Sequence, residues 1–128
     1  MALRFRLETR YADYDTKGHV NNAVYLTYFE VARVKAWLER VGGDPDAPFI
    51  IAEATVRYVR PAMIGTPLDI EVATSEVRTK AWVWRYRILD ARNDALIAEG
   101  QTVQVMYDYA SGRSAEIPSD VRAALTRV

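Results

Sequence analysis

Residues 10–33 read RYADYDTKGHVNNAVYLTYFEVAR, a polar turn that leads directly into the most apolar helical run of the chain. The turn carries two carboxylates, the only histidine and two consecutive asparagines, which are Asp13, Asp15, His19, Asn21 and Asn22. A base, a helix cap and a helix N-terminus therefore fall within one short stretch. This combination can perform acyl chemistry, since a carboxylate can act as a base and free N–H groups can bind an oxyanion.

A single long helix is predicted over residues 23–41. This run contains no glycine or proline, and its apolar residues cover nearly the whole circumference. A helix that is apolar on nearly all sides is typically buried, so we expect a larger element to enclose it. Charged residues, among them Glu30, Arg33 and Lys35, argue against a membrane span. Glu30 and Arg33 have the spacing of a pair on the helix surface.

Both ends of this helix carry residues typical of caps. Asn21 or Asn22 can accept hydrogen bonds from the free N–H groups of the first turn. Gly42 and Gly43 are expected to end the helix, because glycine readily adopts the left-handed conformation common at helix ends.

The rest of the chain alternates between apolar and polar residues, which is typical of strands with one buried face. The predicted strands cover residues 2–11, 49–60, 68–78, 81–90 and 95–109, and turns such as 42–48 separate them. In the first strand the apolar face is Leu3, Phe5, Leu7, Thr9 and Tyr11; in the second it is Ile50, Ala52, Ala54, Val56 and Tyr58. Irregular alternation near Gly100 indicates a bulge. Ser119 is a candidate cap for a short helix over 120–126.

The order of elements predicts an α+β fold, with a curved five-stranded antiparallel sheet around one long central helix. Four consecutive strands suggest a meander. One sheet covers only one side of a helix, so either the sheet curls strongly or a second subunit covers the remainder. We favour a homodimer formed by pairing of sheet edges.

Composition excludes several classes of function. The 128 residues form one domain of ordinary size, with 17 basic and 17 acidic side chains, so no net charge attracts nucleic acid or an anionic membrane. The chain has no cysteine and one histidine, which argues against disulfides, a thiolate nucleophile and a metal site. No signal peptide or membrane span is evident, so a cytoplasmic location is expected.

Asp15 is the candidate catalytic residue. Its side chain has an ordinary pKa of roughly 3.9 and is ionised at neutral pH. A carboxylate beside a helix N-terminus can activate water or attack an acyl carbon itself. The N–H groups of Asn22 and Ala23 can hold the oxyanion, and such donors contribute about 3 kcal/mol each in hydrolases. This set is sufficient for thioester hydrolysis.

A structural explanation remains open for the same residues. Aspartate and asparagine are common in turns and caps whatever the function. A single histidine in a loop is more often a structural hydrogen-bonding group than a catalyst, so His19 is only a secondary candidate.

Two blocks of the sequence resemble a known family. The run YADYDTKGHVNNAVYLTYFEVAR is similar to the signature of hotdog-fold acyl-CoA thioesterases, the 4-hydroxybenzoyl-CoA thioesterase-like group. The later run VRYVRPAMIGTPLDI resembles the second block of that group, in which a strand with Tyr, Arg and Pro leads into a Gly turn. The resemblance spans almost the whole chain, including its length and element order.

The resemblance implies one hotdog thioesterase domain over residues 1–128, in a homodimer or homotetramer with active sites at the subunit interface. It implies Asp15 as the catalytic carboxylate and the Asn22 N–H as the oxyanion contact. The expected substrate-binding residues are Ala23, Tyr25, Tyr58, Val59, Arg60 and Pro61. No cofactor or metal is implied, since CoA is part of the substrate.

The chain departs from related patterns at a few positions. The residues after Asp15 are Thr16, Lys17 and Gly18, where many members have Pro, Ala or Met before the Gly. The related plant acyl-carrier-protein thioesterases carry Asp-x-Asn-x-His. Here Lys17 stands at the Asn position, so their full catalytic set is not transferred to His19.

Three alternatives to acyl-CoA hydrolysis follow from the sequence. A hotdog hydratase is disfavoured, because its Asp and His are five apart with Asn and Pro between, whereas Asp15 and His19 are four apart. A thioesterase acting on acyl carrier protein and a non-catalytic protein that binds acyl thioesters stay open. The acyl group and the residues that bind the CoA phosphates are not specified by the sequence.

Overall fold

The computed structural model describes residues 2–42 and 48–128. Its elements are β1 (Leu3–Leu7), η1 (Tyr11–Asp13), α1 (Val24–Ala36), η2 (Trp37–Val41), β2 (Phe49–Tyr58), β3 (Leu68–Val77), β4 (Ala81–Asp90), β5 (Ala95–Asp108), β6 (Arg113–Ser114) and α2 (Ser119–Leu125). Most of the turn predicted over 42–48 lies outside the described residues. The predicted order of strand, long helix and four strands is confirmed, and β6 is an addition that the sequence pattern did not indicate.

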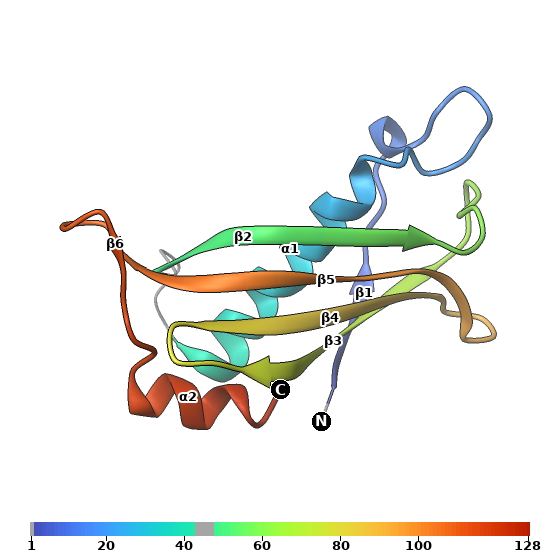
Figure 1. Cartoon of the computed structure of the whole chain (residues 1–128). Helices are drawn as coiled ribbons and strands as arrows, with labels where there is room; N and C mark the ends of the chain where they lie inside the picture. The colour runs from blue at the N-terminus through green and yellow to red at the C-terminus, as the bar shows by residue number, and fades with distance from the viewer. Residues whose placement is uncertain (1, 43–47) are drawn as a thin grey trace.

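The strands form one antiparallel sheet in the order β1-β3-β4-β5-β2, with β6 paired to the end of β5. The sheet curves and α1 crosses its concave face (Figure 1), which confirms the predicted α+β architecture. The expected meander is wrong in one respect: β2 lies beside β5 and not beside β3. Strand β2 therefore forms one edge of the sheet, and β5 is its only partner among the described strands.

The first strand is shorter than predicted. It ends at Leu7, and residues Tyr11–Asp13 form a 3-10 turn. Tyr11, expected on the apolar face, is 94% exposed. Leu3 and Leu7 are buried as predicted. The alternation of residues 8–11 therefore belongs to a connection, because no neighbouring strand among the described residues pairs with it.

The helical run Val24–Val41 matches the prediction, with its last part in π-helical geometry. One side is buried against the sheet, including Tyr25, Phe29 and Ala32. The other side leaves four large apolar residues about two-fifths exposed: Leu26, Val31, Val34 and Leu38. The sheet of one chain therefore encloses only part of the helix.

The helical run ends at Val41, before Gly42, as predicted, but Gly42 itself does not adopt the expected left-handed conformation. Gly42 is extended, with φ −145°. A Cβ at this position would lie 3.3 Å from the ring of Trp37, so any side chain larger than glycine would require the ring to shift. Gly43 lies outside the described residues.

Strand β2 contains a bulge at Ala52, between Ile51 and Glu53. Before it Phe49 packs on the rings of Trp37 and Trp82, and after it Val56 packs against the core. Of the predicted inward face, only Val56 is half-buried, whereas Ile50, Ala52, Ala54 and Tyr58 are exposed.

Strand β5 also has an irregularity, but it lies at Ile97 and not near Gly100. Gly100 has a different function. A Cβ there would lie 2.7 Å from the ring of Phe29 and 2.2 Å from the backbone oxygen of Thr55. The absence of a side chain allows α1 to rest on the sheet, with Phe29 stacked on Tyr86 at 4.5 Å.

Replacement of Gly100 by alanine is expected to lower the free energy of unfolding by about 2–3 kcal/mol, since overpacking typically costs 1–3 kcal/mol and here one contact is backbone. Chemical denaturation measures this change. Gly65→Ala is the comparison, because its Cβ would meet no atom within 4 Å, although its φ of +86° adds a local cost. Equal stability of Gly100→Ala and the unmutated protein would show that β2 can move aside freely.

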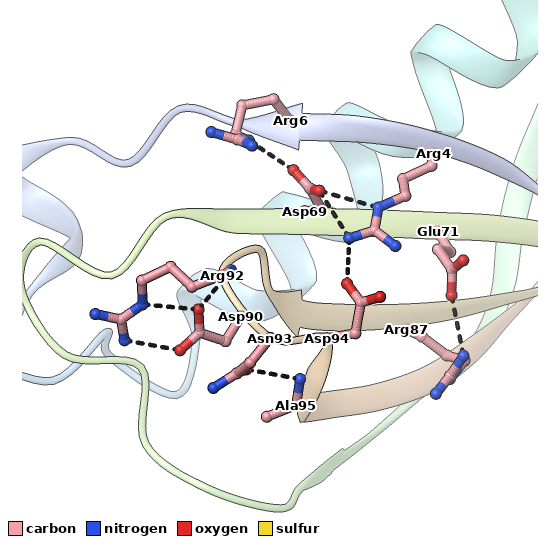
Figure 2. Close-up of polar contacts among 10 residues, drawn as sticks. All are labelled: Arg4, Arg6, Asp69, Glu71, Arg87, Asp90, Arg92, Asn93, Asp94 and Ala95. Carbon is pink, nitrogen blue, oxygen red and sulfur yellow. Dashed lines mark hydrogen bonds and ion pairs between the residues drawn. The ribbon is translucent and has the colours of Figure 1, made fainter.

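The outer face of the sheet is covered by ion pairs (Figure 2). Arg4 and Arg6 of β1 both contact Asp69 of β3, and Arg87 of β4 contacts Glu71. At the β4–β5 turn, hydrogen bonds from Arg92 lower the pKa of Asp90 to about 2. These charges account for polar positions in the patterns of β1, β3 and β4.

The chain ends in α2, which packs Leu125 into the core. The helix begins at Ser119 after Pro118, and no side-chain cap bond forms, so the predicted capping role of Ser119 is wrong. Among the described residues, no helix is both long and apolar enough to cross a membrane.

Candidate active site

The loop that carries Asp15 is a small hairpin. The Asp15 N–H donates to the His19 carbonyl at 2.8 Å, and Gly18 closes the turn with φ +76°. Val20 N–H donates to the Ala62 carbonyl at 2.9 Å, and Ile64 N–H donates to the Gly18 carbonyl at 3.0 Å. These bonds attach the loop to the segment that follows β2, and so bring the two conspicuous sequence blocks together.

Asp13 anchors this loop to the helix. Its side chain is only 1% exposed and accepts hydrogen bonds from the Arg10 N–H (2.9 Å), the Arg10 guanidinium (2.8 and 3.0 Å) and the Tyr28 hydroxyl (2.8 Å). Burial alone would raise the pKa of Asp13, but these donors outweigh burial and lower it. The pKa of Tyr28 is raised by burial and by the same bond.

Asp15 faces outward two residues later. Its Oδ1 accepts hydrogen bonds from the Lys17 N–H at 2.9 Å and the His19 N–H at 3.2 Å. The first of these is the main cause that lowers the pKa of Asp15, and desolvation opposes it. No hydrogen bond from another described residue reaches Oδ2. The aspartate therefore shapes the turn with one oxygen and presents the other as a free ionised acceptor.

The start of α1 distinguishes between the two proposed oxyanion donors. The Ala23 N–H donates to Asn21 Oδ1 at 3.0 Å, and the Val24 N–H donates to the Asn21 carbonyl at 2.9 Å. Asn21 is therefore the capping asparagine. The Ala23 N–H is occupied, which corrects the expectation that it is available. The Asn22 N–H makes no hydrogen bond to another described residue.

Asp15 opens onto a pocket of about 330 Å³ between the loop, the start of α1 and the end of β2. The lining residues are Asp15, His19, Val20, Asn22, Tyr25, Tyr58, Val59, Arg60 and Pro61. All predicted site residues except Ala23 thus lie around one hollow. Ala23 is exposed at the helix start but does not line the pocket.

Two tyrosines form the aromatic wall of this pocket. The rings of Tyr25 and Tyr58 meet edge to face with their centroids 5.2 Å apart. The Tyr58 hydroxyl donates to the Asn22 carbonyl at 2.8 Å. Tyr58 therefore connects the end of β2 to the backbone at the start of α1, a positioning role that the sequence motif did not reveal.

Among residues 2–42 and 48–128, no group of three or more histidine, cysteine, aspartate or glutamate side chains is arranged to hold a metal ion. The pocket offers one carboxylate, one imidazole and one guanidinium, from Asp15, His19 and Arg60.

Comparisons with known proteins identify the family of the chain. The model of the thioesterase-like superfamily matches residues 9–125. The acyl-CoA thioester hydrolase YbgC of Escherichia coli O157:H7 is 26% identical over 125 residues, which cover 94% of this chain and 92% of that protein.

Two solved structures are also similar to the chain. A thioesterase from Thermus thermophilus, complexed with coenzyme A and Zn, superimposes with a TM-score of 0.87 at 30% identity, covering 97% of this chain and 91% of that one. A 1,4-dihydroxy-2-naphthoyl-CoA thioesterase from Synechocystis has a TM-score of 0.84 at 19% identity, over 98% and 96% of the two chains, and shares the fold. The chain therefore belongs to the thioesterase-like superfamily and is a thioester hydrolase with the hotdog fold.

Proposed function

We propose that the chain is a single hotdog domain, residues 1–128, that hydrolyses acyl-CoA thioesters at the Asp15 pocket. The observation that carries this proposal is the combination of a free carboxylate oxygen on Asp15 and a free N–H on Asn22 at one hollow of the described structure. The similarity to YbgC, named an acyl-CoA thioester hydrolase, supports CoA as the thiol carrier.

The carboxylate of Asp15 acts as a general base or as a nucleophile. As a base, it takes a proton from water while the water oxygen attacks the thioester carbon. As a nucleophile, it attacks the carbon itself, and water then hydrolyses the mixed anhydride. In either case the carbon–sulfur bond breaks, and CoA leaves as a thiolate that acquires a proton. The lowered pKa of Asp15 keeps the carboxylate ionised throughout the neutral range.

The Asn22 N–H binds the oxyanion of the tetrahedral intermediate. A donor at a helix N-terminus stabilises negative charge through both its hydrogen bond and the helix dipole. His19 is a secondary candidate that lines the same pocket. Five further lining residues, Tyr25, Tyr58, Val59, Arg60 and Pro61, bind the acyl and pantetheine groups.

The working unit is a homodimer or a homotetramer. Strand β2 is an edge of ten residues, mostly exposed, whose outer side pairs with no described strand, and such edges readily pair with another copy. Tyr58 lies at the end of this strand, so pairing of two β2 edges would bring the second subunit to the pocket wall.

The direct test is release of thiol from a panel of short, medium, long and aromatic acyl-CoAs. Hydrolysis of at least one class supports the proposal and names the acyl group. Release only from an acylated carrier protein would replace CoA by that carrier as the substrate. Tight binding of acyl-CoA without any release would indicate a non-catalytic binding protein.

Tyr58→Phe tests how the helix start is held. Loss of its 2.8 Å bond to the Asn22 carbonyl is expected to lower kcat about two- to tenfold with little change in KM, since a neutral hydrogen bond contributes about 0.5–1.5 kcal/mol. Tyr109→Phe is the matched control, because the Tyr109 hydroxyl also donates to a β2 carbonyl, that of Phe49, at the far end of the strand. Equal kcat values for both variants and the unmutated enzyme would contradict this role.

A further inference from the structure

Arg33 is a buried cation in the middle of α1. Only 9% of this residue is exposed. Among the described residues no carboxylate lies within ion-pair distance of it, although the arginines at positions 4, 6, 10, 57, 78, 87 and 92 each have an acidic partner. Burial of a charge is costly unless an opposite charge compensates for it. Within the part of the chain that the structure describes, Arg33 therefore lacks the partner that its burial requires.

The groups beneath Arg33 are polar but neutral. The Arg33 guanidinium faces the hydroxyl of Tyr86, where it partly offsets the effect of burial, which raises the pKa of that phenol. The Tyr86 hydroxyl is 2.6 Å from Thr102 Oγ1, which in turn donates to Gln104. This chain of buried hydroxyl and amide groups solvates the guanidinium without neutralising its charge.

Arg33 lies on the side of α1 that faces the β2 edge. On the opposite side, the Lys35 ammonium lies over the ring of Phe5 in β1. Trp37, one turn after Arg33, packs on Phe49 of β2. Residues three or four apart share one face of a helix, so Arg33 belongs to the same side as Trp37.

Glu30 lies on this side as well and supplies an uncommitted negative charge. It is exposed and forms no ion pair with a described residue. The pair with Arg33 that the spacing suggested is not formed, because Arg33 turns inward toward Tyr86. Among residues 2–42 and 48–128, one turn of helix thus presents a buried cation without an acidic partner and an exposed anion without a basic one.

We propose that two copies of the chain exchange these charges, so that Arg33 of each subunit pairs with Glu30 of the partner subunit. A two-fold axis across α1 near residues 31 and 32 places residue 30 of one helix level with residue 33 of the other. A two-fold interface is self-complementary, so both contacts form together. This inference rests on the proposed homodimer and adds the ion pairs that specify it.

The surroundings of this face favour a second copy as the source of the carboxylate. Leu26, on the same side and one turn before Glu30, is 43% exposed. The neighbouring strand β2 has backbone groups that no described strand pairs with on its outer edge. The pocket that contains Asp15 does not include Arg33. An apolar residue, an unpaired strand edge and two unmatched charges together form an interface surface for an identical partner.

The test compares charge-reversal variants by sedimentation equilibrium. Glu30→Arg brings two arginines together at each contact, and Arg33→Glu brings two glutamates together. Each is expected to raise the dimer dissociation constant about tenfold or more, since like charges juxtaposed in an interface oppose association strongly. Lys35→Glu, a reversal on the β1 side of the same helix, is the control and is expected to leave the constant unchanged.

Mixing the two variants gives the decisive result. A heterodimer of Glu30→Arg with Arg33→Glu restores both opposite-charge contacts, so it is expected to form in preference to either homodimer. If Arg33→Glu does not fold, Arg33→Gln replaces it. A heterodimer of Arg33→Gln with Glu30→Arg has neither of the two arginine–arginine contacts that the Glu30→Arg homodimer contains, so it is still expected to form in preference to that homodimer.

Other outcomes would overturn the inference in distinguishable ways. A dimer that neither reversal weakens, with random mixing, would refute the exchanged pairs but leave the dimer and its activity intact. A monomer at all concentrations that still hydrolyses acyl-CoA would refute the dimer and leave the proposed activity. Loss of hydrolysis of substrates with an acidic acyl group alone, in Arg33→Gln but not in Glu30→Arg and with dimers of unchanged stability, would assign Arg33 to substrate binding instead.

Discussion

Asp15→Asn is expected to lower kcat for thioester hydrolysis by about 10²–10⁴-fold, the usual contribution of a positioned general base. The amide oxygen of asparagine can still accept the hydrogen bonds from the Lys17 and His19 N–H groups. The turn is therefore retained while the negative charge and basicity are lost. Steady-state thiol release measures kcat, and binding of a non-hydrolysable acyl-CoA analogue should remain within a few-fold of the unmutated value.

The control for this substitution is Asp108→Asn. Asp108 forms the same local bond, with its Oδ1 accepting from the N–H two residues later, that of Ala110, at 3.0 Å. It does not line the Asp15 pocket, so its replacement should leave kcat unchanged. If hydrolysis survives Asp15→Asn at a comparable rate, the catalytic carboxylate has been misassigned and His19 becomes the next residue to replace.

Asp13→Ala is expected to lower the free energy of unfolding by about 3 kcal/mol, because it leaves buried donors without their charged acceptor. The Tyr28 hydroxyl and the Arg10 backbone N–H would lose their partner. Denaturation by urea measures the change. Glu76→Ala is the control: the Glu76 side chain is 54% exposed and pairs with Arg78 on the surface, where removal of an ion pair costs about 1 kcal/mol or less.

The contribution of Asp13 to the free energy of unfolding is also expected to depend on pH. The folded-state pKa of Asp13 is lower than its unfolded value, so its contribution is fully present above the unfolded pKa. It is lost as the pH falls through that value toward the folded pKa. The stability difference between the unmutated protein and Asp13→Ala should therefore be constant at neutral pH and shrink in acid. A difference that grows on acidification would contradict this assignment.

Much of the fold was predictable because the spacing of apolar residues along the sequence indicates which side chains are buried. Strand β4 was predicted at its observed bounds, and its inward residues Trp82, Trp84, Tyr86 and Ile88 are buried. The pairing of β2 with β5 was not predictable, since alternation identifies a face but not a neighbour. Gly100 was misinterpreted for a related reason: its function depends on Phe29, which is distant in the sequence.

The members of the site were predictable from the two blocks, but their bonds were not. Asp15, His19, Asn22 and the strand end at Tyr58 meet at one pocket, whereas their catalytic roles stay predictions. The choice between Asn21 and Asn22 as the cap depends on the side-chain geometry at the helix start. The anchoring bond between Asp13 and Tyr28 connects positions fifteen apart, and no local pattern indicates it.

Because β2 contains one extra residue, the number of residues in this strand matters more for its structure than the identity of most of them. Because Ala52 is bulged, Phe49 near the beginning of the strand and Tyr58 at its end both point inward although one has an odd and the other an even number. Deletion of one residue at this point would reverse which face of the sheet the side chains on one side of the bulge occupy. Either Phe49, which contacts Trp37, or Tyr58, whose hydroxyl binds the Asn22 carbonyl, would then lie on the outer face. Genetic variation in this strand should therefore be accepted as substitutions, while single-residue insertions and deletions are eliminated.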